Sequence, residues 1–214
     1  MAVPWTRETS GAPGIPLRCR MLQCNCRAMP VTVYNHRMEE GQQAPVIRDA
    51  TLQDVAAITE IYHDAVCNTL ATMDTDPPDS ASRTEWLGRH GGRYPVLIAE
   101  CSEVVVGWAS LSVWIARGAC RYTPEASVYV AASYRRRGIG RLLLLSPIGR
   151  AHTQHHVVVA QVIRDNDVSL DLLRDVGFRD SGLIQDADYK FWRWLDPCML
   201  QFDLPYPPGT EPGA

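Results

Sequence analysis

A carboxylate, an apolar run and a glycine-containing loop follow one another closely and form the most chemically informative stretch of the chain. Glu125 precedes the run Ser-Val-Tyr-Val over 127–130, and the segment Gly-Ile-Gly over 138–140 begins eight residues after Val130. The run predicts a strand, and the glycines predict a loop that opens a helix. The first turn of a helix has backbone N–H groups without partners and a partial positive charge. This arrangement predicts a site for a ligand that carries phosphate groups.

Arginines surround these glycines and add positive charge to the loop. Two glycines without side chains let a pyrophosphate approach the backbone closely. The loop is not a Walker loop, because no Gly-Lys-Ser/Thr follows, and it lacks the third glycine of the dinucleotide fingerprint. A solvated arginine patch on a turn is the alternative that the loop alone leaves open. The predicted cofactor-binding loop comprises Arg135, Arg136, Arg137, Gly138, Ile139, Gly140 and Arg141.

The order Arg-x-x-Gly-x-Gly after a Val-Tyr-Val strand resembles the acetyl-coenzyme A pyrophosphate loop of the GNAT superfamily of N-acetyltransferases. Other segments are similar to its phosphinothricin acetyltransferase group, and the match extends from about Ile47 to Leu204. These segments are Arg117, 122–130, 165–169, 176–178 and 189–196. The resemblance implies an α/β fold with helices on both faces of a mixed, mostly antiparallel sheet. It also implies acetyl-CoA as co-substrate, a small amino-acid-like acceptor of the phosphinothricin or methionine sulfoximine type, and a homodimer.

The resemblance also implies a base and an oxyanion donor. Acetyl transfer requires a neutral amine, and a nearby carboxylate can accept the proton that the ammonium must lose. Glu125 matches this base; the alternative is that it pairs with Arg117 or Arg121. The thioester carbonyl needs a donor where negative charge develops, which the superfamily supplies from a backbone N–H of a splayed strand. The cofactor-binding residues of that strand are Val128, Tyr129 and Val130, with the N–H coming from around the last two.

Five further residues complete the implied site. Asn166 and Ser169 begin a predicted helix, so helix capping explains both, and the resemblance adds contacts with the pantetheine arm and the coenzyme. Arg117, Tyr122 and Lys190 match segments near the acceptor site, where a cation would suit an acidic acceptor such as an amino-acid carboxylate or phosphinate. For Lys190 the alternative is a surface loop beside a Trp-rich hairpin, as part of a dimer surface.

The chain departs from the group's pattern at three positions. Leu173 stands where the group usually has histidine, and Cys120 stands where an aromatic residue is usual. Pro147 falls inside the helix predicted after Gly140, where proline costs about 3 kcal/mol unless it lies in a first turn or at a kink. These departures favour the alternative function, a degenerate acetyltransferase fold that binds coenzyme A or a protein partner without turnover.

Composition excludes several classes of protein. The 214 residues are 46% hydrophobic, and 21 basic against 24 acidic side chains give a net charge of −3. This balance excludes a chain-wide basic footprint for nucleic acid. No apolar run approaches the roughly 18 to 20 residues that span a bilayer, so we expect no membrane partner. Seven irregularly spaced cysteines predict reduced thiols in a cytoplasmic protein.

No metal site is expected. Cys19, Cys24 and Cys26 lack the paired spacing of structural zinc sites, and a cluster of three histidines has no suitably placed carboxylate partner. These histidines are His152, His155 and His156.

The elements that must position these residues follow from hydrophobic periodicity. Expected strands are 46–48, 96–99, 104–113, 127–130, 157–163 and 198–204. Expected helices are 52–66, a short one capped by Ser80 or Ser82, one opening at 138–140, and 168–176. Residues 1–45, with five arginines and one acid over 1–37, are expected to be a disordered extension. We expect the acetyltransferase domain over 46–205 and a disordered tail over 206–214.

Overall fold

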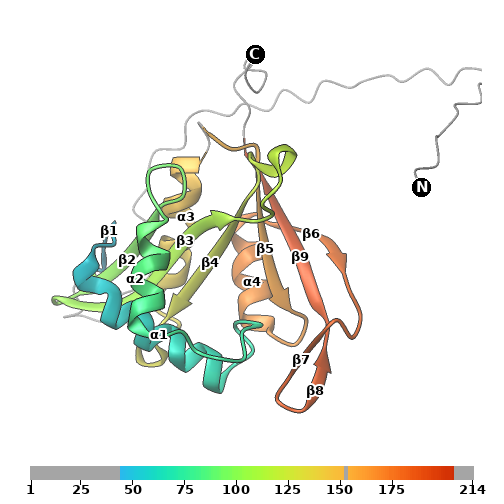
Figure 1. Ribbon diagram of the computed structural model, residues 1–214, viewed down its shortest axis with the longest axis horizontal. Coiled ribbons are helices and arrows are strands. Elements are labelled where there is room, and N and C mark those ends of the chain that lie inside the picture. Colours follow the sequence, from blue (N-terminus) through green and yellow to red (C-terminus); the bar gives the residue numbers. More distant parts are fainter. Residues whose placement is uncertain (1–43, 152–153, 205–214) are drawn as a thin grey trace, which may run out of the picture. The chain divides into compact units, whose positions relative to one another are not determined.

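The structure is a computed structural model that describes residues 44–151 and 154–204. Its described part forms a seven-stranded sheet in the order β1-β2-β3-β4-β5-β9-β6 and a separate hairpin, β7–β8 (Figure 1). The strands are β1 Val46–Asp49, β2 Val96–Cys101, β3 Val104–Val113, β4 Pro124–Val130, β5 Val157–Ile163, β6 Arg179–Leu183, β7 Asp188–Lys190, β8 Arg193–Leu195 and β9 Pro197–Asp203. The segments expected to be disordered lie outside the described residues, apart from 44 and 45.

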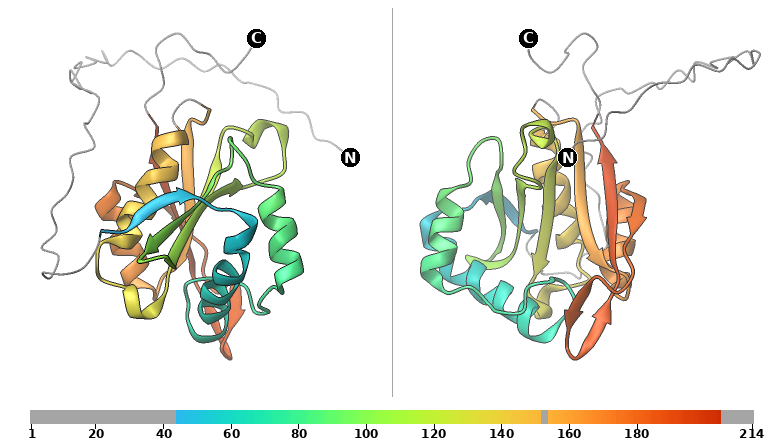
Figure 2. Two further views of the ribbon diagram at one scale, coloured as in Figure 1. Left: turned by 90° about the vertical axis from the view of Figure 1, so that its left-hand side faces the viewer. Right: turned by 45° about the vertical axis from the view of Figure 1, so that its right-hand side comes forward.

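Helices cover both faces of the sheet, which confirms the predicted fold class (Figure 2). On one face, α1 (Val55–Asn68) and α2 (Ser80–Gly88) pack against alternate strand residues such as Ile98 and Trp108. On the other face lie α3 (Ile139–Ala151) and α4 (Asp167–Val176). The helix α3 covers the intervening residues of the strands, whose side chains point away from α1 and α2.

All neighbouring strand pairs of the described sheet are antiparallel except β4 and β5. These two strands pair at a single position, Glu125 opposite Val159. Figure 1 shows β4 and β5 diverging toward their C-terminal ends. The divergence leaves one edge of β4 without a ladder partner in the middle of the sheet.

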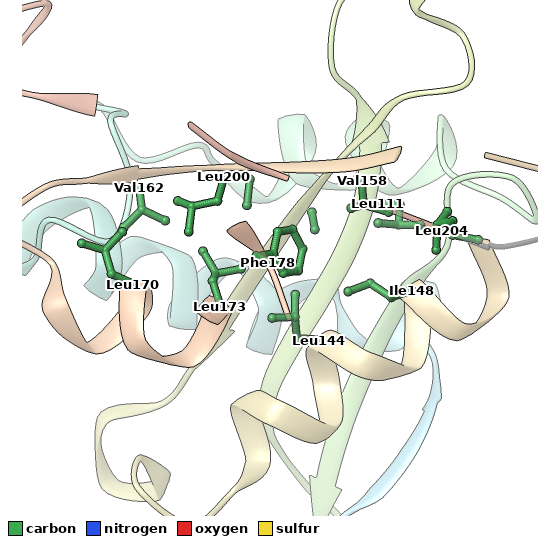
Figure 3. Close-up of a cluster of buried hydrophobic side chains, with 13 residues drawn as sticks. Leu111, Leu144, Ile148, Val158, Val162, Leu170, Leu173, Phe178, Leu200 and Leu204 are labelled. Atoms are coloured by element: carbon green, nitrogen blue, oxygen red, sulfur yellow. The ribbon is translucent and has the colours of Figure 1, made fainter. Parts of the chain in front are cut away.

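The largest core cluster fills the space between β5, β9 and the helices α3 and α4 (Figure 3). Leu173 is 4% exposed there and packs with Phe178 and Leu200. The leucine that replaces the expected histidine is therefore a core residue. Pro147 is also buried, and α3 continues through it from Ile139 to Ala151. The proline does not end the helix.

Local sequence signals explain the element starts, with one correction. The Asp54 carboxylate accepts a hydrogen bond from the Thr51 N–H at 2.7 Å, the reciprocal bond of a capping box at the start of this helical segment. The cap of α2 is Asp79, which accepts from the Ser82 N–H at 2.8 Å, and not Ser80 or Ser82. Because Asp79 is the residue with extended backbone at that helix end, it is the one placed to cap.

Three short strands had no clear signal in the sequence. The edge strand β6 is exposed along its whole length, so it shows no apolar alternation. The turn between β7 and β8 places Phe191 and Trp192 at φ 52° and 62°, a conformation that usually carries asparagine or glycine. Without those residues the hairpin's turn was not recognisable. In the described part of the chain, no helix is both long and apolar enough to cross a membrane.

Candidate active site

The unpaired edge of β4 presents main-chain groups to the gap between β4 and β5. The Ala131 N–H donates to the Val106 carbonyl at 2.9 Å, across the ladder from β4 to β3. In an antiparallel pair, hydrogen bonding to a given neighbour alternates from residue to residue. Tyr129 therefore bonds β3, whereas the main chains of Val128 and Val130 face the gap. The Val130 N–H, one of the groups expected to act as an oxyanion donor, therefore faces the gap.

The side chains of β4 divide between the two faces of the sheet. Val128 and Val130 pack with α3. Tyr129 lies against Tyr62 of α1 and Trp108 of β3, with ring centroids 5.0 and 4.7 Å away. Because alternate residues share a face, Glu125 and Tyr129 both point toward α1 and α2. Glu125 is therefore at the point of divergence, on the face that those two helices cover.

The Glu125 carboxyl group is half-buried, and this burial raises its pKa above the usual range. Among the described residues it forms no ion pair, and neither Arg117 nor Arg121 contacts it. The alternative of a simple salt bridge is therefore not found. A carboxyl group with a raised pKa and no ion-pair partner among the described residues holds a proton more readily than an ordinary glutamate, as suits a general base.

The glycines of the loop after β4 have two separate roles. Gly138 has φ 78°, a left-handed conformation that a side chain disfavours. A Cβ on Gly140 would lie 3.2 Å from Leu172 and 3.8 Å from Val130, so this glycine allows α3 to pack closely. The first helical hydrogen bond runs from the Leu142 N–H to the Gly138 carbonyl at 3.2 Å. The N–H groups of Ile139 and Gly140 precede it and have no acceptor within the helix.

The four arginines of the loop are not equivalent. The Arg135 guanidinium donates to the Val130 carbonyl at 3.0 Å and pairs with Asp64 at 3.4 Å. Arg137 donates to a backbone carbonyl within the loop, and Arg141 to a carbonyl at the end of α4. Arg136 is exposed, and no described residue forms a hydrogen bond or ion pair with it. Arg136 is therefore the loop's available cation in the described part of the chain.

The start of α4 shows the capping that the sequence indicated. The Asn166 side chain accepts a hydrogen bond from the Ser169 N–H at 3.3 Å. Both residues lie at the N-terminal end of α4, beside β5. Contacts of these residues with a coenzyme remain predictions.

The three residues predicted to bind the acceptor lie in different environments. Arg117 is exposed and begins the loop segment before β4. The Tyr122 ring lies beneath two guanidinium groups, those of Arg121 at 4.6 Å and Arg93 at 5.4 Å from its centroid. Arg117 and Tyr122 both precede Glu125 closely in the chain and so lie near the beginning of β4.

Lys190 is buried, which excludes the surface-loop interpretation and leaves its role at the acceptor site a prediction. It is only 5% exposed, and its ammonium donates to the carbonyls of Thr69 at 3.1 Å and Thr72 at 2.8 Å. It therefore anchors the β7–β8 hairpin to the segment after α1 instead of lying on a surface loop. Burial lowers the pKa of this ammonium. Two of its three donors are already used within the protein.

The sheet-facing side of α2 carries polar side chains that were not among the predicted site residues. Arg83 is 5% exposed, and its guanidinium lies 4.4 Å from the Tyr62 ring centroid and 4.7 Å from that of Trp86. Its Nε atom is buried without a partner among the described residues. His90, just beyond α2, lies within hydrogen-bonding distance of Ser112 of β3. The spacing of 83, 86 and 90, which places residues on one helix side, was the signal available.

The histidine cluster near β5 shows no metal-site geometry where it is described. His155 is buried, and its Nε2 lies 2.9 Å from the Arg93 carbonyl. No group of three His, Cys, Asp or Glu side chains within 44–151 and 154–204 is arranged to hold a metal ion. His152 lies outside the described residues.

A mixed sheet whose two parallel strands diverge beside an open helix start offers main-chain groups and a positive helix end to a ligand that carries phosphate groups. The sequence model of the Acetyltransferase (GNAT) family matches residues 58–178. The chain belongs to the GNAT acetyltransferase family, and the protein is an N-acetyltransferase.

Several relatives are similar over most of their length. An L-methionine sulfoximine/L-methionine sulfone acetyltransferase from Pseudomonas paraeruginosa is 40% identical over 161 residues, covering 74% of this chain and 94% of the relative. A Salmonella typhimurium acetyltransferase, whose structure contains its cofactor acetyl-CoA, has a TM-score of 0.75 and 36% identity, covering 80% of this chain and all of that one. A phosphinothricin acetyltransferase from Sinorhizobium meliloti, in complex with acetyl-CoA, has a TM-score of 0.76 and 32% identity over 80% and 94% of the two chains.

Proposed function

We propose that this N-acetyltransferase transfers the acetyl group of acetyl-CoA directly to the amino group of a small amino-acid-like acceptor, of the methionine sulfoximine or phosphinothricin type. The observation that carries the proposal is the position of Glu125. Its half-buried, unpaired carboxyl group lies where β4 and β5 diverge. The names of the relatives described above support the choice of acceptor class.

The residues of the β4–α3 region fit acetyl-CoA. The diverging strands leave the Val128 carbonyl and the Val130 N–H for the pantetheine amides, whereas the Val130 carbonyl accepts from Arg135. The start of α3 offers N–H groups and the positive end of the helix dipole to the pyrophosphate, and Arg136 adds a free guanidinium. Asn166 and Ser169, at the start of α4, border the same gap. Bound here, the coenzyme supplies an activated acetyl group as a thioester.

Glu125 prepares the acceptor for attack. An ammonium has no lone pair, so the amine becomes nucleophilic only after it loses a proton. The ionised Glu125 carboxylate accepts this proton, directly or through one water. At a rise of about 3.3 Å per residue the Val130 N–H lies too far along β4 from Glu125, so the Val128 N–H, which also faces the gap, is the donor that stabilises the negative charge developing on the acetyl oxygen. No metal is needed for either step.

Arg117 is the proposed partner of the acceptor's anionic group. It is exposed near the beginning of β4, and a guanidinium can bind a carboxylate or phosphinate through two parallel hydrogen bonds. Tyr122 forms the adjoining wall. Lys190 is less suitable, because its ammonium is buried against two carbonyls.

We also propose that the protein is a cytoplasmic homodimer that associates through the β7–β8 hairpin. Tyr189, Trp192 and Trp194 of this hairpin are 50%, 92% and 61% exposed. Large aromatic side chains with this exposure are typical of protein interfaces. Sedimentation of the wild-type protein and of Trp194→Ser tests this proposal, with a dimer expected for the first and a monomer for the second.

A thiol-release assay with acetyl-CoA tests the activity. The panel comprises methionine sulfoximine, phosphinothricin, methionine sulfone, a polyamine and a peptide with a free amino terminus. We expect the highest kcat/KM for an anionic amino acid and a loss of at least tenfold in acceptor kcat/KM for Arg117→Ser. Faster acetylation of the polyamine or peptide would contradict the proposed acceptor class.

A further inference from the structure

His90 and Ser112 form a hydrogen-bonded pair whose geometry determines the tautomer of the imidazole ring. His90 Nδ1 lies 2.7 Å from the Trp86 carbonyl, and Nε2 lies 3.0 Å from the Ser112 hydroxyl oxygen. A carbonyl only accepts hydrogen bonds, so Nδ1 carries the hydrogen and donates. In the neutral ring, Nε2 then has the free lone pair. The Ser112 hydroxyl therefore donates to His90.

Ser112 lies directly opposite Glu125 in the ladder between β3 and β4. Directly opposed residues point to the same face of the sheet, with Cβ atoms about 4.5–5.5 Å apart. Both side chains therefore point toward α2. Because the Ser112 proton is directed at His90, the lone pairs of its oxygen remain available. A nitrogen placed between the two side chains would meet the Glu125 carboxylate on one side and the Ser112 oxygen on the other.

Acetylation of an ammonium requires the nitrogen to lose two protons in turn. The nitrogen loses one proton before it can attack and a second one when the amide forms. The C–N bond forms as the C–S bond breaks, so one proton finally neutralises the thiolate and the other leaves to water. Glu125 can accept only one proton at a time. With a second acceptor beside it, Glu125 would not have to release its first proton before the second one leaves the nitrogen.

We propose that Ser112 and His90 are this second proton acceptor. The acceptor nitrogen releases a proton to the Ser112 oxygen while the Ser112 hydroxyl proton passes to His90 Nε2. The resulting imidazolium keeps its hydrogen bond from Nδ1 to the Trp86 carbonyl. This inference rests on the proposed acetylation of an amine at Glu125.

The surroundings of His90 keep its ring neutral and give it a route to water. Burial lowers the pKa of His90, and the positive charge of Arg83 lowers it further. The charged and titratable groups around it are Arg83 on α2, Glu125 across the sheet, and the ion-paired Asp49 and Arg150. His90 also lines a cavity of about 480 Å³ with Asp49 and Arg150, through which solvent reaches the ring edge.

Steady-state kinetics of His90→Gln and Ser112→Ala test the pair, with His63→Gln as a histidine control. Glutamine can accept from Ser112 and donate to the Trp86 carbonyl, but it cannot take up a proton. His63 is exposed on α1, away from Ser112. We expect kcat to fall at least tenfold in His90→Gln and Ser112→Ala, with the KM for acetyl-CoA and the thermal midpoint unchanged. Ser112→Thr, which keeps the hydroxyl group, should retain most of the activity.

The pH profile separates proton transfer from a structural role. The wild-type profile of kcat should contain an ionisation that disappears in His90→Gln, and the imidazole ¹⁵N shifts should show hydrogen on Nδ1 in the neutral ring. A folded His90→Gln variant with wild-type kcat and pH profile would overturn the inference. If the wild-type protein acetylates no amine, the proposed function itself fails, and the NMR tautomer still reports on the pair.

Discussion

Glu125 owes its chemistry to its position as the second residue of β4. There the strand still pairs with β5, and beyond this point the two strands diverge. Burial without a partner among the described residues raises the pKa of the carboxyl group. Further along β4, the Tyr129 ring is enclosed by aromatic side chains that hold the strand against α1 and α2. The carboxyl group thus lies at the start of a packed strand, which suits the role of base proposed for it.

Replacement of Glu125 by glutamine should remove the base and keep its shape. We expect kcat to fall by about a hundredfold or more, because general-base catalysis contributes 10² to 10⁴. The affinity for acetyl-CoA, measured by calorimetry, should change little. Wild-type turnover in Glu125→Gln at every pH would place the base elsewhere.

The pH dependence of kcat/KM should reveal the raised pKa. Glu125 must be ionised to accept a proton, so activity should increase as pH rises through the pKa of the group in the folded protein. Because burial raises this pKa, the acidic limb should lie above the value of about 4.3 for an ordinary glutamate. The limb should vanish in Glu125→Gln. A limb centred at or below 4.3 would contradict the assignment.

At the scale of elements, the loop between β4 and α3 combines a strained backbone with one available cation. Gly138 and Arg136 both have positive φ, a conformation that costs Arg136 more than it costs the glycine. Three neighbouring arginines contact the protein and support the loop. The proposed pyrophosphate site therefore consists of helix N–H groups and Arg136.

Arg136→Ser should weaken the binding of acetyl-CoA about fivefold to tenfold at low salt, because an exposed charge pair is worth about 1 kcal/mol. The difference from wild type should decrease as salt is added. Arg89→Ser is the matched control, since Arg89 carries the same charge but pairs with Glu85 on α2. Equal affinities for coenzyme in Arg136→Ser and wild type would contradict the role of Arg136.

The β7–β8 turn is the second element with a testable conformation. Trp192 has φ 62°, which costs a residue with a side chain about 1–2 kcal/mol. In the monomeric chain, Trp192→Gly should therefore raise the free energy of unfolding by about 1 kcal/mol, as measured with denaturant at protein concentrations too low for the proposed dimer to form. Trp194→Gly, in the adjacent strand, should lower it, because glycine weakens a strand. A destabilised Trp192→Gly variant would show that the indole makes contacts that outweigh the strain.

At the scale of the whole molecule, the described sheet and helices form a complete acetyltransferase architecture without residues before 44. The three core clusters use residues from β2 to β9 and all four α-helices. The family match begins at residue 58. These core clusters and the proposed site therefore use only residues that the structure describes.

A chain that begins at Met38 should have the same thermal midpoint and turnover as the full chain. Residues 1–37 have five arginines against one acid and no apolar periodicity, so they cannot offset an ordering cost of about 1–2 kcal/mol per residue. Differential scanning calorimetry and the thiol-release assay measure both properties. A loss of several degrees would show that the segment contacts the domain.

The sequence by itself determined the order of the main elements and the β4–loop–α3 unit. It also indicated Glu125 and the capping role of Asn166. These features depend on residues close together in the chain, through periodicity, glycine and capping chemistry. The exposed strand β6 and the aromatic turn of β7–β8 lacked such local signals. Their formation depends on neighbours that pack against them.

Only the tertiary structure decided which distant side chains meet. Lys190 is buried because its ammonium reaches the carbonyl of Thr72, 118 residues earlier in the chain. His90 and Ser112 are 22 residues apart and meet because α2 packs on the same sheet face as Glu125. Such contacts follow from packing and strand register. Local sequence patterns do not encode either one.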